Sequence, residues 1–153
     1  MEILLTDIFD PRSIKLNLES ASKEEAFAEL IGAVASLHPE LDPAEVLAAI
    51  VARENKMSTG IAPGVAIPHA ICKGAGDKSA GIIGAIGISK AGIEYDALDG
   101  KPVHAIFMLI IGERANHLRA LNQICALAQS EGFALIRNAK TPRDVQAVLA
   151  ELS

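Results

Sequence analysis

The sequence predicts an α/β protein: a three-layer sandwich in which helices flank both faces of a central mixed β-sheet. Three observations lead to this prediction. Helix-capping signals recur along the chain, short continuous apolar runs lie between them, and the two kinds of segment interleave. Continuous apolar runs are typical of strands covered on both faces, and such strands need a helical layer on each side of the sheet.

Three helices begin at recognisable caps. Ser22 starts a capping box with Glu25, and Asp42 and Thr141 each precede a proline at the first helical position. A fourth amphipathic helix is expected to begin near Asn116. The apolar residues at helical spacing in these four segments are Ala26, Phe27, Leu30, Ile31, Val34 and Leu37; Val46, Leu47, Ile50 and Val51; Val145, Val148, Leu149 and Leu152; and Leu118, Leu121, Ile124, Cys125 and Ala128.

Three segments carry strand signals. Residues 14–18 alternate between apolar and polar, as a half-buried strand does, whereas residues 81–88 and 103–111 are short apolar runs suited to central strands. Residues 96–102 form a turn-rich connection. The glycines at 81, 84 and 87 do not form the GxGxxG pattern of a dinucleotide site, so they are expected to serve close backbone packing.

Size and composition exclude several classes of protein. The 153 residues contain no repeat and no linker, so residues 1–153 are expected to form a single domain. The net charge of −5 and the absence of tryptophan argue against nucleic-acid binding. No apolar stretch approaches the roughly 20 residues that span a membrane, and the first residues do not resemble a signal peptide. A soluble cytoplasmic domain is therefore expected, with Cys125 in its core.

The four histidines differ in their sequence context. His38 ends a helix just before a proline and is expected to be solvated, whereas His104 lies inside an apolar strand, where a structural imidazole is expected. His117 falls in the first turn of a predicted helix, where the helix dipole disfavours an imidazolium and favours a bound anion. His117 taken alone is equally compatible with a structural and a functional role.

His69 has the most specific context. In residues 64–70 (GVAIPHA) an apolar run ends at a proline, which constrains the backbone that presents the imidazole. Residues 52–61 (ARENKMSTGI) place Arg53 and two hydroxyls just upstream, before a glycine turn. A base or nucleophile that is neutral near pH 7, close to a guanidinium, is suited to carrying a phosphoryl group. This pattern makes phosphoryl transfer the leading hypothesis.

Residues 69–79 can be compared with two kinds of cofactor site, a tetrahedral metal site and a phosphate-binding P-loop. His69 and Cys72 are three residues apart, but no second pair completes a tetrahedral metal site. Residues 74–79 (GAGDKS) contain a Lys-Ser pair without the glycine directly before the lysine that a phosphate-binding P-loop requires. The sequence therefore predicts no metal and no nucleotide cofactor.

Four segments in order, residues 52–61, 64–69, 99–103 and 117–121, resemble the IIA domain of the mannitol, fructose and nitrogen-regulatory branch of the bacterial phosphoenolpyruvate-dependent sugar phosphotransferase system. The resemblance covers essentially the whole chain and implies the mannitol-type IIA fold. It implies that His69 is phosphorylated by a small histidine phosphocarrier protein and that Arg53 and His117 flank it. In sugar-transporting members the group then passes to a cysteine of a IIB domain; in regulatory members the phosphorylation state controls partner proteins.

The sequence departs from the family pattern in two loops. Ala62-Pro63 replaces a glycine and a variable residue, and Gly112-Glu113 replaces Pro-Glu. Both departures lie beside the expected site and bear on the choice of partner. The absence of a IIB-like segment favours the regulatory role. The alternative is a non-catalytic α/β module that senses a ligand or partner, which predicts a cavity with convergent polar groups away from His69.

Overall fold

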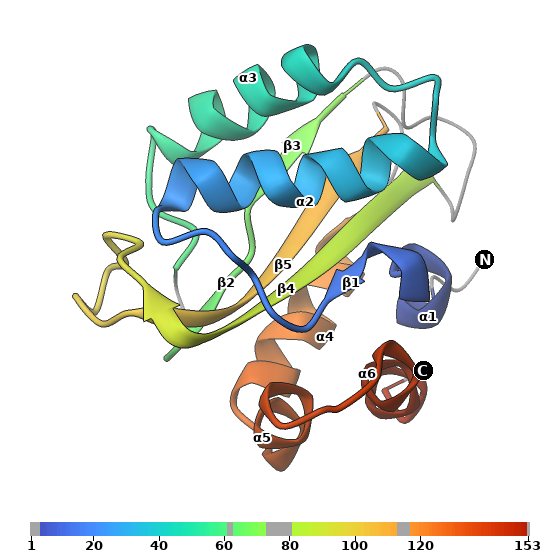
Figure 1. Cartoon of the computed structure of the whole chain (residues 1–153), viewed down its shortest axis with the longest axis vertical. Coiled ribbons are helices and arrows are strands. Elements are labelled where there is room, and N and C mark those ends of the chain that lie inside the picture. The colour runs from blue at the N-terminus through green and yellow to red at the C-terminus, as the bar shows by residue number, and fades with distance from the viewer. Residues whose placement is uncertain (1–3, 61–62, 73–80, 113–116, 153) are drawn as a thin grey trace.

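The computed structural model describes residues 4–60, 63–72, 81–112 and 117–152 of the chain (Figure 1). The elements follow one another as α1 (Leu5–Ile8), the 3-10 helix η1 (Pro11–Ser13), β1 (Ile14–Lys15), α2 (Lys23–Leu37), α3 (Pro43–Glu54), β2 (Val65–Ala66), β3 (His69–Ile71), β4 (Ile82–Ile93), β5 (Val103–Ile111), α4 (Leu118–Ala128), α5 (Glu131–Arg137) and α6 (Pro142–Ala150).

The predicted helix caps are confirmed at atomic level. The side chains of Ser22, Asp42 and Thr141 accept hydrogen bonds from backbone N–H groups in the first turns of α2, α3 and α6. In α6 the N3 carboxylate of Asp144 also accepts from the backbone of the cap, which completes a capping box. The fourth predicted helix begins at Leu118, two residues after the expected start.

The sheet is mixed, as predicted. Its order is β1-β4-β5-β2, and β3 also pairs with β5. Strands β4 and β5 are antiparallel, whereas β1 runs parallel to β4, and both β2 and β3 run parallel to β5. Val65 lies opposite Ala105 and His69 opposite Leu109, so β2 and β3 follow each other along one edge of β5. Pro68 between them has no N–H to donate, which interrupts the ladder there.

Helices cover both faces of this sheet (Figure 1), so the predicted three-layer sandwich is confirmed. Helices α2 and α3 lie on one face, where alternate β5 residues Ile106, Met108 and Ile110 belong to their apolar cluster. Helices α1, α4 and α6 cover the other face, against Phe107 and Leu109. The central strands are therefore apolar on both sides, which explains their uninterrupted hydrophobic runs.

The structure differs from the sequence prediction in several element boundaries. The first strand spans only Ile14–Lys15, although Leu18 N still donates to the carbonyl oxygen of Ile88 in β4 at 2.9 Å. A Cβ atom at Gly87 would lie 2.7 Å from Leu18 Cδ1, and one at Gly84 would lie 2.5 Å from Phe9 Cε1, so these glycines do serve close packing. Strand β4 extends to Ile93, and the short helices α1 and α5 have no counterpart in the prediction.

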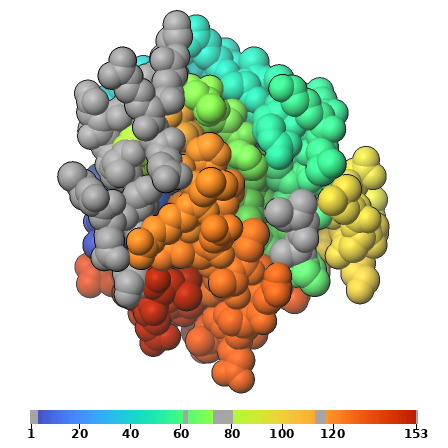
Figure 2. Space-filling model, turned by 180° about the vertical axis from the view of Figure 1, so that it is seen from behind, coloured from blue at the N-terminus to red at the C-terminus, as the bar shows by residue number. Residues whose placement is uncertain are grey.

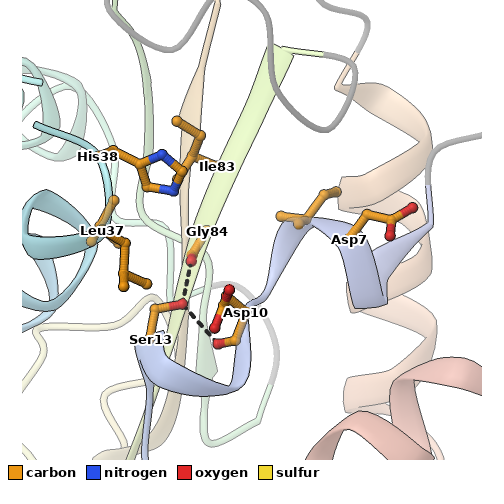
Figure 3. A pocket seen from close by; sticks show the side chains of 9 residues that line it. Asp7, Asp10, Ser13, Leu37, His38, Ile83 and Gly84 are labelled. Atoms are coloured by element: carbon orange, nitrogen blue, oxygen red, sulfur yellow. Dashed lines mark hydrogen bonds between the residues drawn. The ribbon is translucent and has the colours of Figure 1, made fainter. Parts of the chain in front are cut away.

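The expectation of a solvated His38 is wrong. Its side chain is only 17% exposed and its Nδ1 lies 3.3 Å from Glu40 Oε1. The imidazole lines a cavity of about 200 Å³ between the end of α2 and the segment that follows α1 (Figure 3). In this cavity the Ser13 hydroxyl lies 2.9 Å from the carbonyl oxygen of Gly84, which ties η1 to β4. Packing of the N-terminal segment against the sheet therefore covers a helix end that the local sequence marks as open.

No helix within the described residues is long and apolar enough to cross a membrane.

Candidate functional site

The first part of the site is the turn at the C-terminal end of α3. Arg53 lies in the last turn of that helix, and its Nη1 donates to the carbonyl oxygen of Met57 at 3.0 Å. The N–H of Lys56 donates to the carbonyl oxygen of Arg53 at 3.2 Å. The Arg53 residue thus closes the turn through both its side chain and its backbone, and this restricts the position of its own guanidinium.

A buried carboxylate lies under this turn. The Glu54 side chain is 3% exposed, and its oxygens accept from Thr59 N at 2.9 Å, Thr59 Oγ1 at 2.6 Å and Lys23 Nζ at 3.2 Å. The Tyr95 hydroxyl lies 3.1 Å from Glu54 Oε1. Burial on its own would raise the pKa of Glu54, but the Thr59 hydrogen bonds and the Lys23 charge outweigh burial and hold that pKa below its usual value.

The same network connects the α3 turn to the strand edge that carries His69. The carbonyl oxygen of Thr59 accepts from Ile67 N at 3.1 Å, and the carbonyl oxygen of Pro68 accepts from Leu109 N at 2.9 Å. His69 then opens β3 opposite Leu109. The backbone on the N-terminal side of the imidazole is therefore held both by the α3 turn and by the central strand β5.

The His69 imidazole has a defined tautomer. Its Nδ1 lies 2.7 Å from the carbonyl oxygen of Ile67. A carbonyl oxygen can only accept, so Nδ1 carries the proton and a neutral ring keeps its lone pair on Nε2. Burial holds the pKa of His69 below its usual value, and the charges of Arg53 and His117 act in the same direction, against the Ile67 hydrogen bond and Glu54. A neutral ring with a free lone pair is a competent nucleophile.

His69, Arg53 and His117 come together at one cavity. They line a space of about 340 Å³ together with Lys56, Ile71 and neighbouring small residues. His117 occupies the N-cap position of α4, and its ring centroid lies 6.1 Å from that of His69. Figure 2 shows the face on which α3 (teal), β3 (green) and α4 (orange) meet. Three elements that are distant in the sequence thus each supply one of these side chains: α3 supplies Arg53, β3 supplies His69 and the start of α4 supplies His117.

The electrostatics of this cavity favour an anion. Among the described residues, its lining contains two permanent cations, Arg53 and Lys56, two imidazoles and no carboxylate. The Nδ1 atom of His117 is buried and has no hydrogen-bond partner within the described parts of the chain. The N-terminus of α4 adds a favourable dipole.

Sequence reasoning missed several residues of this region. Lys56 follows Arg53 by three residues on the same turn, and that spacing of two cations was an available signal. Thr59 was expected among hydroxyls near the site, but its Oγ1 is bonded to Glu54. No local sequence pattern predicts that Glu54 bonds Lys23 and Tyr95, because Lys23 lies 31 positions before Glu54 and Tyr95 lies 41 positions after it.

The remaining sequence candidates lie elsewhere. His104 is structural, as expected: it is half-buried and its Nδ1 lies 2.9 Å from the carbonyl oxygen of Ser89. Cys125 was predicted to lie in the core, but it is only partly buried and packs against the apolar cluster beneath α4. Among the described residues, no group of three or more histidine, cysteine or acidic side chains could hold a metal ion. The segment 74–79, compared above with a P-loop, lies outside the described residues.

Comparison with known proteins identifies the family. A family model described as "Phosphoenolpyruvate-dependent sugar phosphotransferase system, EIIA 2" matches residues 7–152. The chain belongs to this family. As an EIIA-type domain it is a component of a phosphotransferase system, and its fold and its resemblance to the fructose and nitrogen-regulatory members are confirmed.

Two relatives and one further solved structure are similar to this EIIA-type domain. It is 38% identical over 132 residues to the fructose-specific EIIABC component of Bacillus subtilis, a match that covers 83% of this chain and 20% of that protein. The nitrogen regulatory protein IIA-Ntr of Neisseria meningitidis is 30% identical, with a TM-score of 0.80, and the match covers 95% of this chain and 98% of the other. The mannitol IIA component in its complex with phosphorylated IIB from Escherichia coli has the same fold, at 15% identity and a TM-score of 0.75 over 94% of this chain and 99% of the other.

Proposed function

We propose that this EIIA-type domain is a phosphoryl carrier and that Nε2 of His69 accepts the phosphoryl group from a small histidine phosphocarrier protein. The observation that carries the proposal is the His69 tautomer. Donation from Nδ1 to the Ile67 carbonyl oxygen leaves the Nε2 lone pair available in a cavity that contains cations and no described carboxylate. We further propose that residues 1–153 act as one domain in the cytoplasm.

The bonds and electrons of the transfer step balance without a cofactor. The Nε2 lone pair of His69 forms a bond to phosphorus while the N–P bond of the donor phosphohistidine breaks, and the donor imidazole keeps that electron pair. The His69 ring becomes positively charged with its proton still on Nδ1, and the Ile67 carbonyl oxygen stabilises that charge. Phosphoryl transfer needs mainly positioning and charge stabilisation from the protein, which this site supplies.

The cations and His117 have complementary roles in this proposal. The planar guanidinium of Arg53 stabilises the equatorial oxygens of the phosphoryl group as a hydrogen-bonding fork. Lys56 adds a mobile point charge at the same cavity. His117 lines the same cavity with its ring centroid 6.1 Å from that of His69, which supports a role for that ring as a donor to the phosphoryl group. Together these groups would hold the phosphorylated form until an acceptor arrives.

The acceptor is either the cysteine of a IIB domain or a regulatory target protein. The name of the Bacillus subtilis relative joins A, B and C components, which supports transfer to a IIB domain. The match to almost the full length of the Neisseria meningitidis nitrogen regulatory protein supports a regulatory signal. Mixing the phosphorylated chain with an isolated fructose-type IIB domain separates the two: rapid loss of phosphate to IIB indicates transport, and retention indicates regulation.

The deciding experiment is phosphorylation in a reconstituted system. Incubation with phosphoenolpyruvate, enzyme I and a histidine phosphocarrier is expected to add one phosphoryl group that is acid-labile and base-stable. Tandem mass spectrometry should place the group on His69, and ³¹P NMR should report an Nε2 adduct. His104→Ala serves as the matched control, because that imidazole is structural. Equal labelling of a folded His69→Ala protein would overturn the proposal and favour a module without covalent chemistry.

A further inference from the structure

A second cationic cavity lies at the opposite end of the sheet. It has a volume of about 460 Å³ and separates β4 from α5; its polar and aromatic lining consists of Ser89, Lys90, Ser130, Phe133, Arg137 and Asn138. No carboxylate is among the described residues that line it, although the chain carries a net charge of −5. The described lining thus combines two cations, Lys90 and Arg137, with uncharged residues.

Lys90 lies within an irregularity of β4. The register between β4 and β5 shifts between Ile88 and Ile93. The bulged segment is held at both sides of its chain: Ser89 Oγ accepts from Gly92 N at 3.0 Å, and the carbonyl oxygen of Ser89 lies 2.9 Å from His104 Nδ1. Gly92 has a φ of +90°, a conformation that side-chain-bearing residues rarely adopt. Bulges can re-aim a side chain and are often found at functional sites, and Lys90 lies within this one.

Arg137 is positioned by an aromatic ring. Its guanidinium carbon lies 5.7 Å from the centroid of the Phe133 ring, in a cation–π arrangement. The ring itself packs against Gly64, where a Cβ atom would lie 3.2 Å from Phe133 Cζ. A guanidinium stacked on a ring keeps its N–H edges available for a carboxylate or phosphate. In the described parts of the chain, the ion pairs are formed by other residues than Lys90 and Arg137.

We infer that this cavity binds a small dianion, a phosphate monoester or a dicarboxylate, between Lys90 and Arg137. Two like charges that face one hollow repel each other, and an anion between them converts this repulsion into two attractions. Arg137 offers a hydrogen-bonding fork and Lys90 a point charge, whereas the Ser130 and Asn138 side chains already donate to the carbonyl oxygens of Leu127 and Ala134. The volume falls within the range of small-molecule sites.

The site is distinct from the His69 cavity and does not depend on the function proposed for it. The two cavities share no lining residue. Ile88 pairs with Ala105 of β5 and His69 pairs with Leu109, four residues or about 13 Å further along the strand. Strands β4 and β3 also lie on opposite sides of β5. In Figure 1, α5 is at the bottom and α3 at the top.

The test is a ligand titration of the full chain followed by ¹H–¹⁵N NMR. Glucose 6-phosphate, succinate and inorganic phosphate are titrated separately at constant ionic strength. Saturable shifts of the Ser89, Lys90, Arg137 and Asn138 amides are expected for at least one probe. Saturation by glucose 6-phosphate or phosphate assigns the site to phosphate ligands, saturation by succinate assigns it to dicarboxylates, and saturation by all of them assigns it to dianions in general.

Variants decide whether the two cations form the site. Lys90→Gln and Arg137→Gln should each raise the dissociation constant of the saturating probe about tenfold. Arg137→Lys should raise it less than Arg137→Gln does. Lys140→Gln is the matched control, because Lys140 is exposed and does not line the cavity. Thermal melts show that each variant is folded. The inference is overturned if no probe saturates these amides, if shifts appear only around His69, or if Lys140→Gln weakens binding as much as Lys90→Gln.

Discussion

The Nδ1 atom of His69 lies 2.7 Å from the carbonyl oxygen of Ile67, only two residues earlier in the chain. Pro68 lies between them and restrains the backbone that carries both groups. The contact places the ring proton on Nδ1 and the lone pair on Nε2. The chemical character of the imidazole is therefore decided by the backbone geometry of a three-residue segment, which the α3 turn and β5 hold in place.

The first prediction concerns the protonation of His69. Because burial lowers its pKa, the NMR titration midpoint of His69 should lie below the ordinary value of 6.5. Protonation of His69 should therefore halve the rate of phosphoryl acceptance only at a pH below 6.5. Arg53→Ala should raise this pKa because a positive charge is lost, and Glu54→Gln should lower it further because a negative charge is lost. A wild-type midpoint at or above 6.5 would contradict the burial argument.

The second prediction concerns Arg53. Replacing it with alanine removes a preorganised contact to the developing charge, so phosphoryl transfer should slow about a hundredfold in quench-flow experiments. Arg53→Lys keeps the charge without the fork and should recover only part of the rate. Lys56→Met should have a smaller effect than Arg53→Ala, because an exposed lysine is a screened point charge. Wild-type rates in a folded Arg53→Ala protein would show that the guanidinium serves only the α3 turn.

The third prediction separates acceptance from onward transfer. His117→Ala should still be phosphorylated on His69, but the phosphoryl group should leave more slowly for its acceptor, because a neighbouring donor no longer orients it. Single-turnover assays with the phosphorylated variant measure the second step alone. His38→Ala is a suitable control, since that histidine lines a different cavity. Equal onward rates in wild-type and His117→Ala protein would remove His117 from the site.

The fourth prediction concerns the stability of the support beneath the site. Glu54→Gln should lower the free energy of unfolding by about 2 kcal/mol at pH 7, because a buried carboxylate that accepts several hydrogen bonds is lost. The folded-state pKa of Glu54 lies below its ordinary value of 4.5, so this stabilisation is fully present above pH 4.5 and is lost as the pH falls through the folded-state pKa.

Urea denaturation at neutral and acidic pH measures this difference. The difference in the free energy of unfolding between wild-type and Glu54→Gln protein should become smaller in acid. Tyr95→Phe removes one hydrogen bond to the same carboxylate and should cost only about 1 kcal/mol, and this smaller difference should also shrink in acid because the charged carboxylate accepts the bond. A gap that stays constant from pH 7 into acid would mean that Glu54 contributes through packing rather than through its charge.

Local signals determined much of this protein. Caps such as Ser22, Asp42 and Thr141 act within one helical turn, so they could be read from neighbouring residues alone. The apolar runs of β4 and β5 reflect burial on both faces of a strand and predicted the layered fold. The Pro68-His69 dipeptide and the upstream Arg53 likewise led from short segments of sequence to the prediction of a phosphoryl-carrying histidine. The caps and the apolar runs depend on a few adjacent residues, and tertiary contacts did not override them.

Tertiary structure decided the rest. His38 was buried by a segment about 30 residues away, and Glu54 found its partners Lys23 and Tyr95 far along the chain in both directions. Pairing across β5 brings β3 into position, and packing of α3 and α4 on opposite faces of the sheet brings Arg53 and His117 to the same end of it. Contacts between residues that are far apart in the sequence depend on how the helical layers pack on the sheet. No interaction between neighbouring residues determines them, so they could not be predicted from local sequence.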